Sequence, residues 1–277
     1  MCPANASTVA GMLSWKSEDR FDLGGVRFRT MPSTDLLDGE DLDLADGEFF
    51  IFKPVQEVES YAELVRAHKP KRILELGVYG GGSTVFLAAV ARPERLVALD
   101  IQPLDELQAK LGGAVAAAGL DGDAIRLHGE IDQSNAAALA RIHAEDFGGE
   151  LLDLVIDDAS HVYLPSVASF DMLFPRVRPG GLYVVEDWRW AHEQFDAMLV
   201  DGTAPDRVPM TRLLLEALAV FGQASGLIAS MTIQPDKAIV ERGEAPCPEG
   251  FSLSAMANPG GRALQGAGEA RRRRLFG

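Results

Sequence analysis

The sequence predicts an α/β fold in which a mostly parallel β-sheet carries helices on both faces. Short apolar runs alternate along the chain with longer segments whose apolar residues recur at helical spacing. Several of the short runs end in acidic residues or glycine, as expected where buried parallel strands open into loops at their carboxyl ends. The chain can form one large core, since 47% of its 277 residues are hydrophobic and 24% are charged.

The charge balance and the cysteine content narrow the classes of partner and site. A formal net charge of −15 argues against nucleic acid, whose binding depends on Lys and Arg that neutralise phosphates. Cys2 and Cys247 are too far apart in the sequence to predict a metal-binding or redox pair. The chain opens without a charged and apolar leader, and no apolar run approaches the ~18 residues that cross a bilayer. We therefore expect a cytoplasmic protein with no membrane partner.

Residues 1–53 are expected to form an amino-terminal extension. Apolar residues between positions 21 and 28 indicate a short hairpin that turns at Gly24-Gly25. The segment 35–48 contains seven acids and no base, and we interpret it as a solvated acidic loop. The alternative interpretation is a lid over the active site.

The predicted main domain, residues 54–244, begins with a helix that ends before Pro70 and a first strand at residues 72–76. This strand runs into the glycine turn Gly77-Val-Tyr-Gly-Gly-Gly82, which opens the next helix. Ligands bind at this position in open α/β sheets, because glycines let them approach the backbone. A dinucleotide site would need Gly-x-Gly-x-x-Gly, and the turn lacks the second glycine of that pattern. A nicotinamide-dependent oxidoreductase is therefore the weaker alternative.

The second predicted strand, residues 95–100, carries an acid at its carboxyl end, 23 positions after Gly77 (100 minus 77). An acid at this position of a nucleotide-binding α/β fold accepts hydrogen bonds from ribose hydroxyls, which makes Asp100 the predicted ribose ligand. A helix over residues 104–118 and a third strand over residues 124–128 follow.

Two further strands end in pairs of acids. The apolar strand 151–156 runs into Asp157-Asp158, and the strand 182–187 finishes on Glu186-Asp187. Because neighbouring parallel strands deliver their loops to the same crevice, these carboxylates should meet there and repel one another. A divalent cation such as Mg²⁺, which prefers oxygen ligands, would relieve this repulsion. The alternative is that one acid caps a helix and another pairs with a basic side chain.

His161 follows Asp158 by three positions, near the start of a predicted helix. An imidazole with an unperturbed pKa of about 6.5 is suited to taking a proton near neutral pH, so His161 is a candidate general base. The alternative is a histidine that makes one structural hydrogen bond. Nearby, Tyr163, Trp188 and Trp190 could stack on a sugar or aromatic acceptor, or could simply pack.

The carboxy-terminal part is predicted to complete the sheet. Residues 209–221 have the pattern of a helix, and residues 227–233 and 238–242 can pair as an antiparallel hairpin. With the five preceding strands this makes seven. Residues 245–277 are expected to form a loose tail whose run Arg271–Arg274 is solvated, the alternative being contact with an acidic patch of a second subunit.

These motifs resemble a known family. The turn Glu-x-Gly-x-x-Gly at residues 75–80 resembles the first motif of class I S-adenosylmethionine-dependent methyltransferases, whose Rossmann-like seven-stranded sheet ends in an antiparallel hairpin. Longer runs resemble the metal-dependent O-methyltransferases of macrolide sugar tailoring, the mycinamicin and macrocin type, and related chains often called cephalosporin hydroxylase-like. These runs are Asp132-Gln-Ser134, Val155-Ile-Asp-Asp-Ala-Ser-His161, Ser169-Phe-Asp-Met-Leu-Phe-Pro175 and Pro179-Gly-Gly-Leu-Tyr-Val-Val-Glu-Asp187.

The resemblance, which covers roughly residues 57–242, implies roles for individual residues. The expected S-adenosylmethionine contacts are Glu75, Gly77, Tyr79, Gly80 and Ser83 at the methionine end, Asp100 at the ribose, Asp132 and Gln133 near the adenine, and Asp157. The expected ligands of Mg²⁺, or of another divalent cation, are Asp158, Glu186 and Asp187, with His161 as the base.

The implied reaction is methyl transfer to the metal-bound hydroxyl of a small molecule, a sugar or another natural-product diol. A macrolide substrate is not implied, because the large amino-terminal domain of the macrolide enzymes is missing. Besides the oxidoreductase, a non-catalytic S-adenosylmethionine-binding partner protein is an alternative. A homo-oligomer is left open.

Overall fold

The computed structural model describes residues 12–31, 44–192 and 208–258. Four strands lie in the amino-terminal part: β1 (Ser14–Trp15), β2 (Arg20–Leu23), β3 (Val26–Met31) and β4 (Glu48–Pro54). Seven follow: β5 (Arg72–Leu76), β6 (Arg95–Leu99), β7 (Ile125–His128), β8 (Leu152–Asp157), β9 (Val177–Glu186), β10 (Ile228–Ile233) and β11 (Lys237–Arg242).

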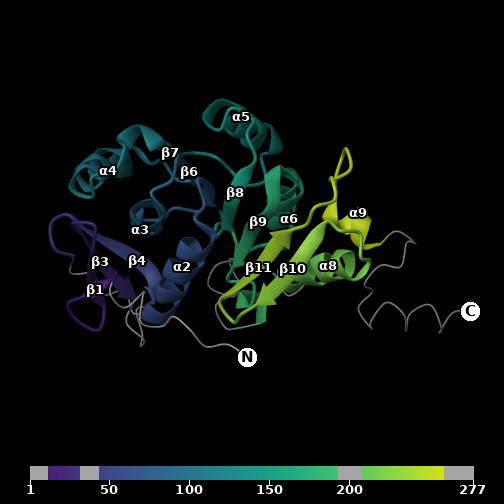
Figure 1. Cartoon of the computed structure of the whole chain (residues 1–277), viewed down its shortest axis with the longest axis horizontal. Coiled ribbons are helices and arrows are strands. Elements are labelled where there is room, and N and C mark those ends of the chain that lie inside the picture. Colours follow the sequence, from purple (N-terminus) through teal and green to yellow (C-terminus); the bar gives the residue numbers. More distant parts are fainter. Residues whose placement is uncertain (1–11, 32–43, 193–207, 259–277) are drawn as a thin grey trace, which may run out of the picture.

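These strands form two sheets (Figure 1). The large sheet has the order β10-β11-β9-β8-β5-β6-β7, and the small sheet has the order β1-β2-β3-β4. In the large sheet the neighbours from β9 to β7 run parallel, whereas β11 pairs antiparallel with both β9 and β10. The predicted fold, a seven-stranded mostly parallel sheet with an antiparallel carboxy-terminal hairpin, is confirmed.

Helices connect the strands and cover both faces of the large sheet. The α-helices are α2 (Val55–His68), α3 (Gly82–Ala91), α4 (Asp105–Ala117), α5 (Ala136–Asp146), α6 (Tyr163–Leu173), α8 (Thr211–Gly222) and α9 (Leu253–Ala257). Short 3-10 turns are η2 (Gly122–Ala124), η3 (Phe174–Arg176) and η4 (Trp190–His192). Within the described ranges, no helix combines the length and the apolar character needed to cross a membrane.

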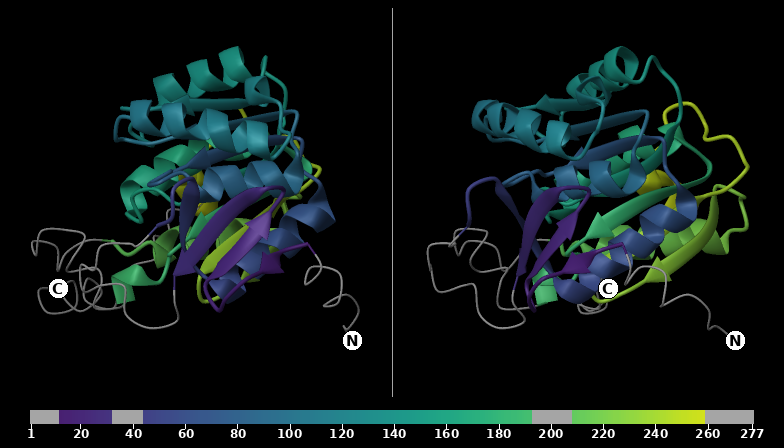
Figure 2. Two further views of the ribbon diagram at one scale, coloured as in Figure 1. Left: turned by 90° about the vertical axis from the view of Figure 1, so that its left-hand side faces the viewer. Right: turned by 60° about the vertical axis from the view of Figure 1, so that its left-hand side comes forward.

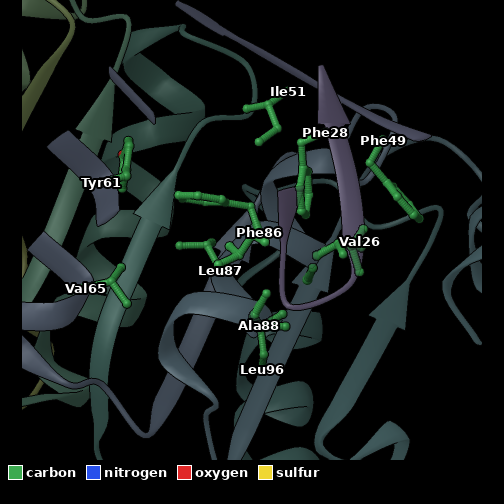
Figure 3. Packing of buried hydrophobic residues seen from close by; sticks show 14 of the residues in the cluster. Val26, Phe28, Phe49, Ile51, Tyr61, Val65, Phe86, Leu87, Ala88 and Leu96 are labelled. Carbon is green, nitrogen blue, oxygen red and sulfur yellow. The ribbon is translucent and has the colours of Figure 1, made fainter. Parts of the chain in front are cut away.

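Alternation along the central strands divides the core into two clusters, one on each face of the large sheet. On β5, Ile73 belongs to the first cluster and Leu74 to the second. The first cluster includes residues of α2, α3 and α4, and Figure 3 shows part of it. The second includes residues of α5, α6, α8 and α9. Consecutive strand residues therefore point to different helical layers.

The small amino-terminal sheet packs onto the first cluster. β2 and β3 form the predicted hairpin with Gly24-Gly25 at its turn, and Phe21 stacks on Phe28 with ring centroids 5.0 Å apart. Both rings make T-shaped contacts with the ring of Phe86 on α3, and Figure 3 shows Phe28 beside Phe86. Figure 2 shows these purple strands lying against the blue helices that cover the large sheet. The amino-terminal strands are thus part of the main core.

Strand β4 crosses the first turn of α3 before it runs into α2. A Cβ atom at position 82 would lie 1.9 Å from the carbonyl oxygen of Phe50, so only glycine permits this crossing. As a result the last residues of β4, including Lys53, reach the carboxyl ends of the large sheet's strands.

The segment after Ala245 contains two buried apolar residues that the sequence analysis did not single out. Within the expected loose tail, the side chains of Phe251 and Leu253 are buried in the second cluster, and the amide of Leu253 donates to Asp171 Oδ1 at 2.7 Å. Because glycine and proline are abundant in this segment, its sequence does not predict that these two apolar residues are buried. The arginine run and most of the acidic segment 35–48, with its proposed role as a lid, lie outside the described residues.

Candidate functional site

A cleft of about 630 Å³ lies where strands β5, β6, β8 and β9 end. Its walls come from the loops that follow these strands, from the loop after β7 and from the end of β4. The volume is within the roughly 300 to 1,000 Å³ of small-molecule sites, and its position is the one at which open α/β sheets bind ligands.

The glycine turn after β5 forms one wall of the cleft. Gly77, Tyr79 and Ser83 all line it, and Tyr79 is 73% exposed with a φ of 49°. The exposed ring of Tyr79 lies beside that of Phe52 on β4, with centroids 5.9 Å apart. Gly80 is not among the residues that line the cleft, and a Cβ atom built on it would meet no atom within 4 Å.

Asp100 joins the turn after β5 to the end of β6. Its Oδ2 accepts hydrogen bonds from the amides of Val78 at 2.8 Å and Tyr79 at 3.1 Å, while Oδ1 accepts from Gln102 at 2.9 Å. Each carboxylate oxygen has two lone pairs, so the group can still accept from a ribose hydroxyl. Asp100 also lines the cleft, and its environment therefore fits the predicted cofactor.

Asp132 and Gln133, which are predicted to lie near the adenine, line the cleft from the loop after β7. Gln133 is 5% exposed, and its side chain donates to Asp157 at 3.0 Å and accepts from the amide of Ser160 at 2.8 Å. Asp132 accepts from the amide and the hydroxyl of Ser134, both at 2.7 Å.

Two predicted cofactor residues face away from the cleft. Asp157 ends β8 on the face of the second cluster, where Ser169 donates to it at 2.7 Å and Tyr183 at 3.1 Å, so it is held beneath α6. Glu75 is buried on the opposite face and accepts from the Thr84 hydroxyl at 2.6 Å. Burial raises the pKa of Asp157 to about 6 and that of Glu75 to about 7. Strand alternation, which the sequence pattern did not resolve at these positions, explains both corrections.

The same alternation separates the two pairs of acids. Asp157 and Glu186 are the last residues of their strands and point to opposite faces of the sheet. Asp158 and Asp187 follow the strands and line the cleft. Each pair thus contributes one carboxylate to the cleft.

Asp158, His161 and Asp187 form a cluster with the geometry of a cation site. Each offers one ligand atom, and these atoms lie within 4.8 Å of one another. Two carboxylates suit a hard divalent cation with waters in its remaining positions. Burial, and then the charges of Asp158 and Glu186, raise the pKa of Asp187 to about 8, a penalty that a bound cation would relieve. The cluster therefore fits the predicted metal.

Glu186, predicted as a third ligand, lies outside this cluster. Its carboxylate accepts from the Tyr61 hydroxyl at 2.5 Å and pairs with Lys53. Because Glu186 is the last strand residue, its side chain enters the first core cluster beneath α2 instead of the cleft. The structure does not bring it to the proposed cation.

His161 has the neutral protonation state that a proton acceptor needs. Its Nε2 is 3.8 Å from Asp158 Oδ1, and its ring centroid is 4.4 Å from that of Trp190. Burial lowers its pKa to about 4, so the imidazole is neutral near pH 7. Its buried Nδ1 has no hydrogen-bond partner among the described residues.

The three aromatic residues considered for stacking on an acceptor have other partners. Trp190 packs on His161, and Trp188 donates its indole N–H to the carbonyl of Gln234 at 2.9 Å. Tyr163 is 5% exposed, and its hydroxyl donates to Glu216 at 2.8 Å. Of the three, Trp190 lines the cleft.

Lys53 is a site residue that the sequence analysis missed. Its Nζ is 2.7 Å from Asp158 Oδ2 and also pairs with Glu186, although 105 positions separate Lys53 from Asp158. Burial alone would lower the pKa of Lys53, but the facing carboxylates raise it well above its usual value. The available signal was a single lysine at the end of the apolar run Phe49-Phe-Ile-Phe-Lys53.

Comparisons with known proteins show which proteins this chain is similar to. Residues 74–188 match the family described as a methyltransferase domain, Methyltransf_24. The Streptomyces olivaceus 8-demethyl-8-(2-methoxy-alpha-L-rhamnosyl)-tetracenomycin-C 3'-O-methyltransferase is 37% identical over 144 residues, which cover 49% of this chain and 32% of the relative. The Micromonospora griseorubida mycinamicin VI 2''-O-methyltransferase is 34% identical over 148 residues, 48% of this chain and 32% of the relative.

The matched region is thus less than half the length of these two curated relatives. Among solved structures, the MycE methyltransferase of the mycinamycin biosynthetic pathway, in complex with Mg and SAH, is 28% identical with a TM-score of 0.50. That match covers 67% of this chain and 49% of the other. The resemblance to mycinamicin-type O-methyltransferases predicted from the motifs is confirmed.

Proposed function

We propose that this chain, whose residues 74–188 match a methyltransferase domain, transfers a methyl group from S-adenosylmethionine to a hydroxyl of a small molecule. The observation that carries the proposal is the position of the Asp158, His161 and Asp187 cluster in the same cleft as the glycine turn and Asp100. The names of the relatives, together with the Mg and SAH of the structural neighbour, support a sugar of a natural product as acceptor.

Each part of the cleft has a separate task in this proposal. Asp100 would accept hydrogen bonds from the ribose, while Asp132 and Gln133 would border the adenine. Asp158 and Asp187 would hold a divalent cation, which when bound lowers the pKa of an acceptor hydroxyl and fixes its position. His161, neutral at pH 7 and packed on Trp190, would take the hydroxyl proton.

Two other functions remain in competition with this one. A nicotinamide-dependent oxidoreductase is less favoured because the glycine turn lacks the dinucleotide pattern. A non-catalytic S-adenosylmethionine-binding protein would keep the cofactor residues but would not need a buried neutral histidine beside two acids. A homo-oligomer and a cytoplasmic location stay predictions.

Calorimetry on the full chain tests the proposal most directly. We expect S-adenosylhomocysteine to bind and NAD not to bind. Release of S-adenosylhomocysteine should then be screened with S-adenosylmethionine, Mg²⁺ and a panel of sugars, phenols and polyketide alcohols. Binding of NAD alone would reject the methyltransferase assignment.

A further inference from the structure

The two acids of the cleft, together with Glu186 beneath it, offer more negative charge than one divalent cation balances. When ionised, Asp158, Glu186 and Asp187 carry three negative charges, and Lys53 supplies one positive charge in direct contact with two of these carboxylates. The remaining two charges match one divalent cation. The other buried lysine nearby, Lys237, is paired with Asp236.

Lys53 and the cluster share Asp158 through its two oxygens. Oδ2 is 2.7 Å from Lys53 Nζ, whereas Oδ1 is the atom that faces His161, at 3.8 Å from Nε2. Lys53 also pairs with Glu186, which Tyr61 holds on the far side by a 2.5 Å hydrogen bond. A cation held by Asp158 and Asp187 would therefore lie close to a fixed ammonium group.

The position of Lys53 is fixed by the fold. β4 is held at the start of α3 by the close approach of Phe50 to Gly82, and Lys53 itself is 8% exposed. Its ammonium group also lies 5.8 Å from the centroid of the Tyr61 ring. A side chain packed in this way cannot simply swing into water when a cation arrives.

We propose that Lys53 is a built-in counter-ion that weakens the binding of a divalent cation to the Asp158, His161 and Asp187 cluster and keeps Glu186 out of the ligand set. The inference rests on the cation site of the proposed function. Lys53 repels an incoming cation and withholds one oxygen of Asp158 and the carboxylate of Glu186 from it. The amino-terminal sheet, through Lys53, thereby sets the cation affinity of the methyltransferase domain.

Calorimetric titration of the full chain with MgCl₂ and with MnCl₂ tests this proposal without an acceptor or turnover. Lys53→Met and Lys53→Gln, which both lose the charge, should bind the cation more tightly by about tenfold, because a nearby like charge is removed. Lys53→Gln retains a hydrogen-bond donor and carries the test if Lys53→Met does not fold. Lys53→Arg keeps the charge and should bind as the unmodified protein does.

Lys110→Met is the matched control for net charge. Lys110 donates to the carbonyl of Glu48 at 2.9 Å, at the other end of β4, and its loss should leave cation affinity unchanged. Equal or weaker binding by both neutral Lys53 variants would overturn the inference and leave the proposed function intact. Absence of cation binding in every protein would instead contradict the cation site itself, and the inference with it.

Discussion

The backbones of Gly77 and Asp158 are in contact at the point where β5 and β8 end. A Cβ atom on residue 77 would lie 2.1 Å from the carbonyl oxygen of Asp158, and the φ of Gly77 is +88°. The amide of Asp158 donates to the carbonyl of Leu76 at 2.9 Å. The glycine turn of the proposed cofactor site and the loop that carries the cation cluster therefore form one packed unit.

Gly77→Ala should lower the free energy of unfolding by about 1 to 3 kcal/mol, because alanine is strained at this φ and its Cβ would displace the loop after β8. Urea denaturation measures the change. Gly80→Ala is the matched control, since a Cβ there meets nothing within 4 Å. Equal stability of the two variants would show that the contact between the loops is not required.

His161→Ala should lower turnover by about 10² to 10⁴-fold, the usual contribution of a positioned general base. Initial rates of S-adenosylhomocysteine release give the change in turnover, and calorimetry should find cofactor affinity unchanged. His68→Ala, on the exposed surface of α2, is the control. Normal turnover in His161→Ala would remove this residue from the mechanism.

Asp100→Ala should weaken the binding of S-adenosylhomocysteine by about 1 to 3 kcal/mol, the range for a hydrogen bond to a charged acceptor. The variant also loses the acceptor for the amides of Val78 and Tyr79, which shape the glycine turn. Calorimetry measures the dissociation constant. Asp105→Ala removes the same charge from the exposed start of α4 and should bind normally. An unchanged constant in Asp100→Ala would exclude the ribose assignment.

Removal of divalent cations by a chelator should abolish turnover but leave the binding of S-adenosylhomocysteine nearly intact, because the cation serves the acceptor. Asp187→Asn should lose the response of turnover to added Mg²⁺. Asp123→Asn, whose side chain is 93% exposed, should keep that response. Full activity of the chelated enzyme would reject the cation's role while leaving the fold assignment untouched.

Glu75 should make the protein less stable as the pH rises. Its pKa is raised to about 7 from 4.5, so the protonated form stabilises the fold at pH 5 and this contribution is lost as the pH rises through 7. The loss between pH 5 and pH 8 should be about 2 to 3 kcal/mol in the free energy of unfolding. In urea denaturation with a chelator present, the free energy of unfolding of Glu75→Gln should depend less on pH than that of the unmodified chain, by this same amount. An identical pH dependence in both proteins would indicate that Glu75 is charged in the fold.

Local patterns in the sequence were sufficient to predict the strands of the large sheet and the end of that sheet at which the cleft forms. Apolar runs closed by glycine or acid predicted the strands, because buried parallel strands need apolar side chains on both faces. The glycine turn at residues 77–82 and the acid at position 100 then located the cleft. The carboxy-terminal hairpin followed from two apolar runs around a short turn.

The tertiary structure decided which side chains of these segments reach the cleft. Asp157 and Glu186 looked equivalent to the acids that follow them, but strand alternation turns both into the core. Their direction depends on where each strand stops, and a shift of one residue reverses it.

Long-range packing decided the remainder of the site. Lys53 reaches Asp158 because β4 pairs parallel with β3 and crosses α3, an arrangement that no local period encodes. Phe251 and Leu253 lie in a glycine-rich segment whose local pattern does not predict burial. Both are buried because they pack into the second cluster. The sequence by itself thus determined the seven strands of the large sheet, most of the helices beside them and the glycine turn, since these depend on neighbouring residues. The partners of the buried charges were decided only by the tertiary structure, because they come from segments far apart in the chain.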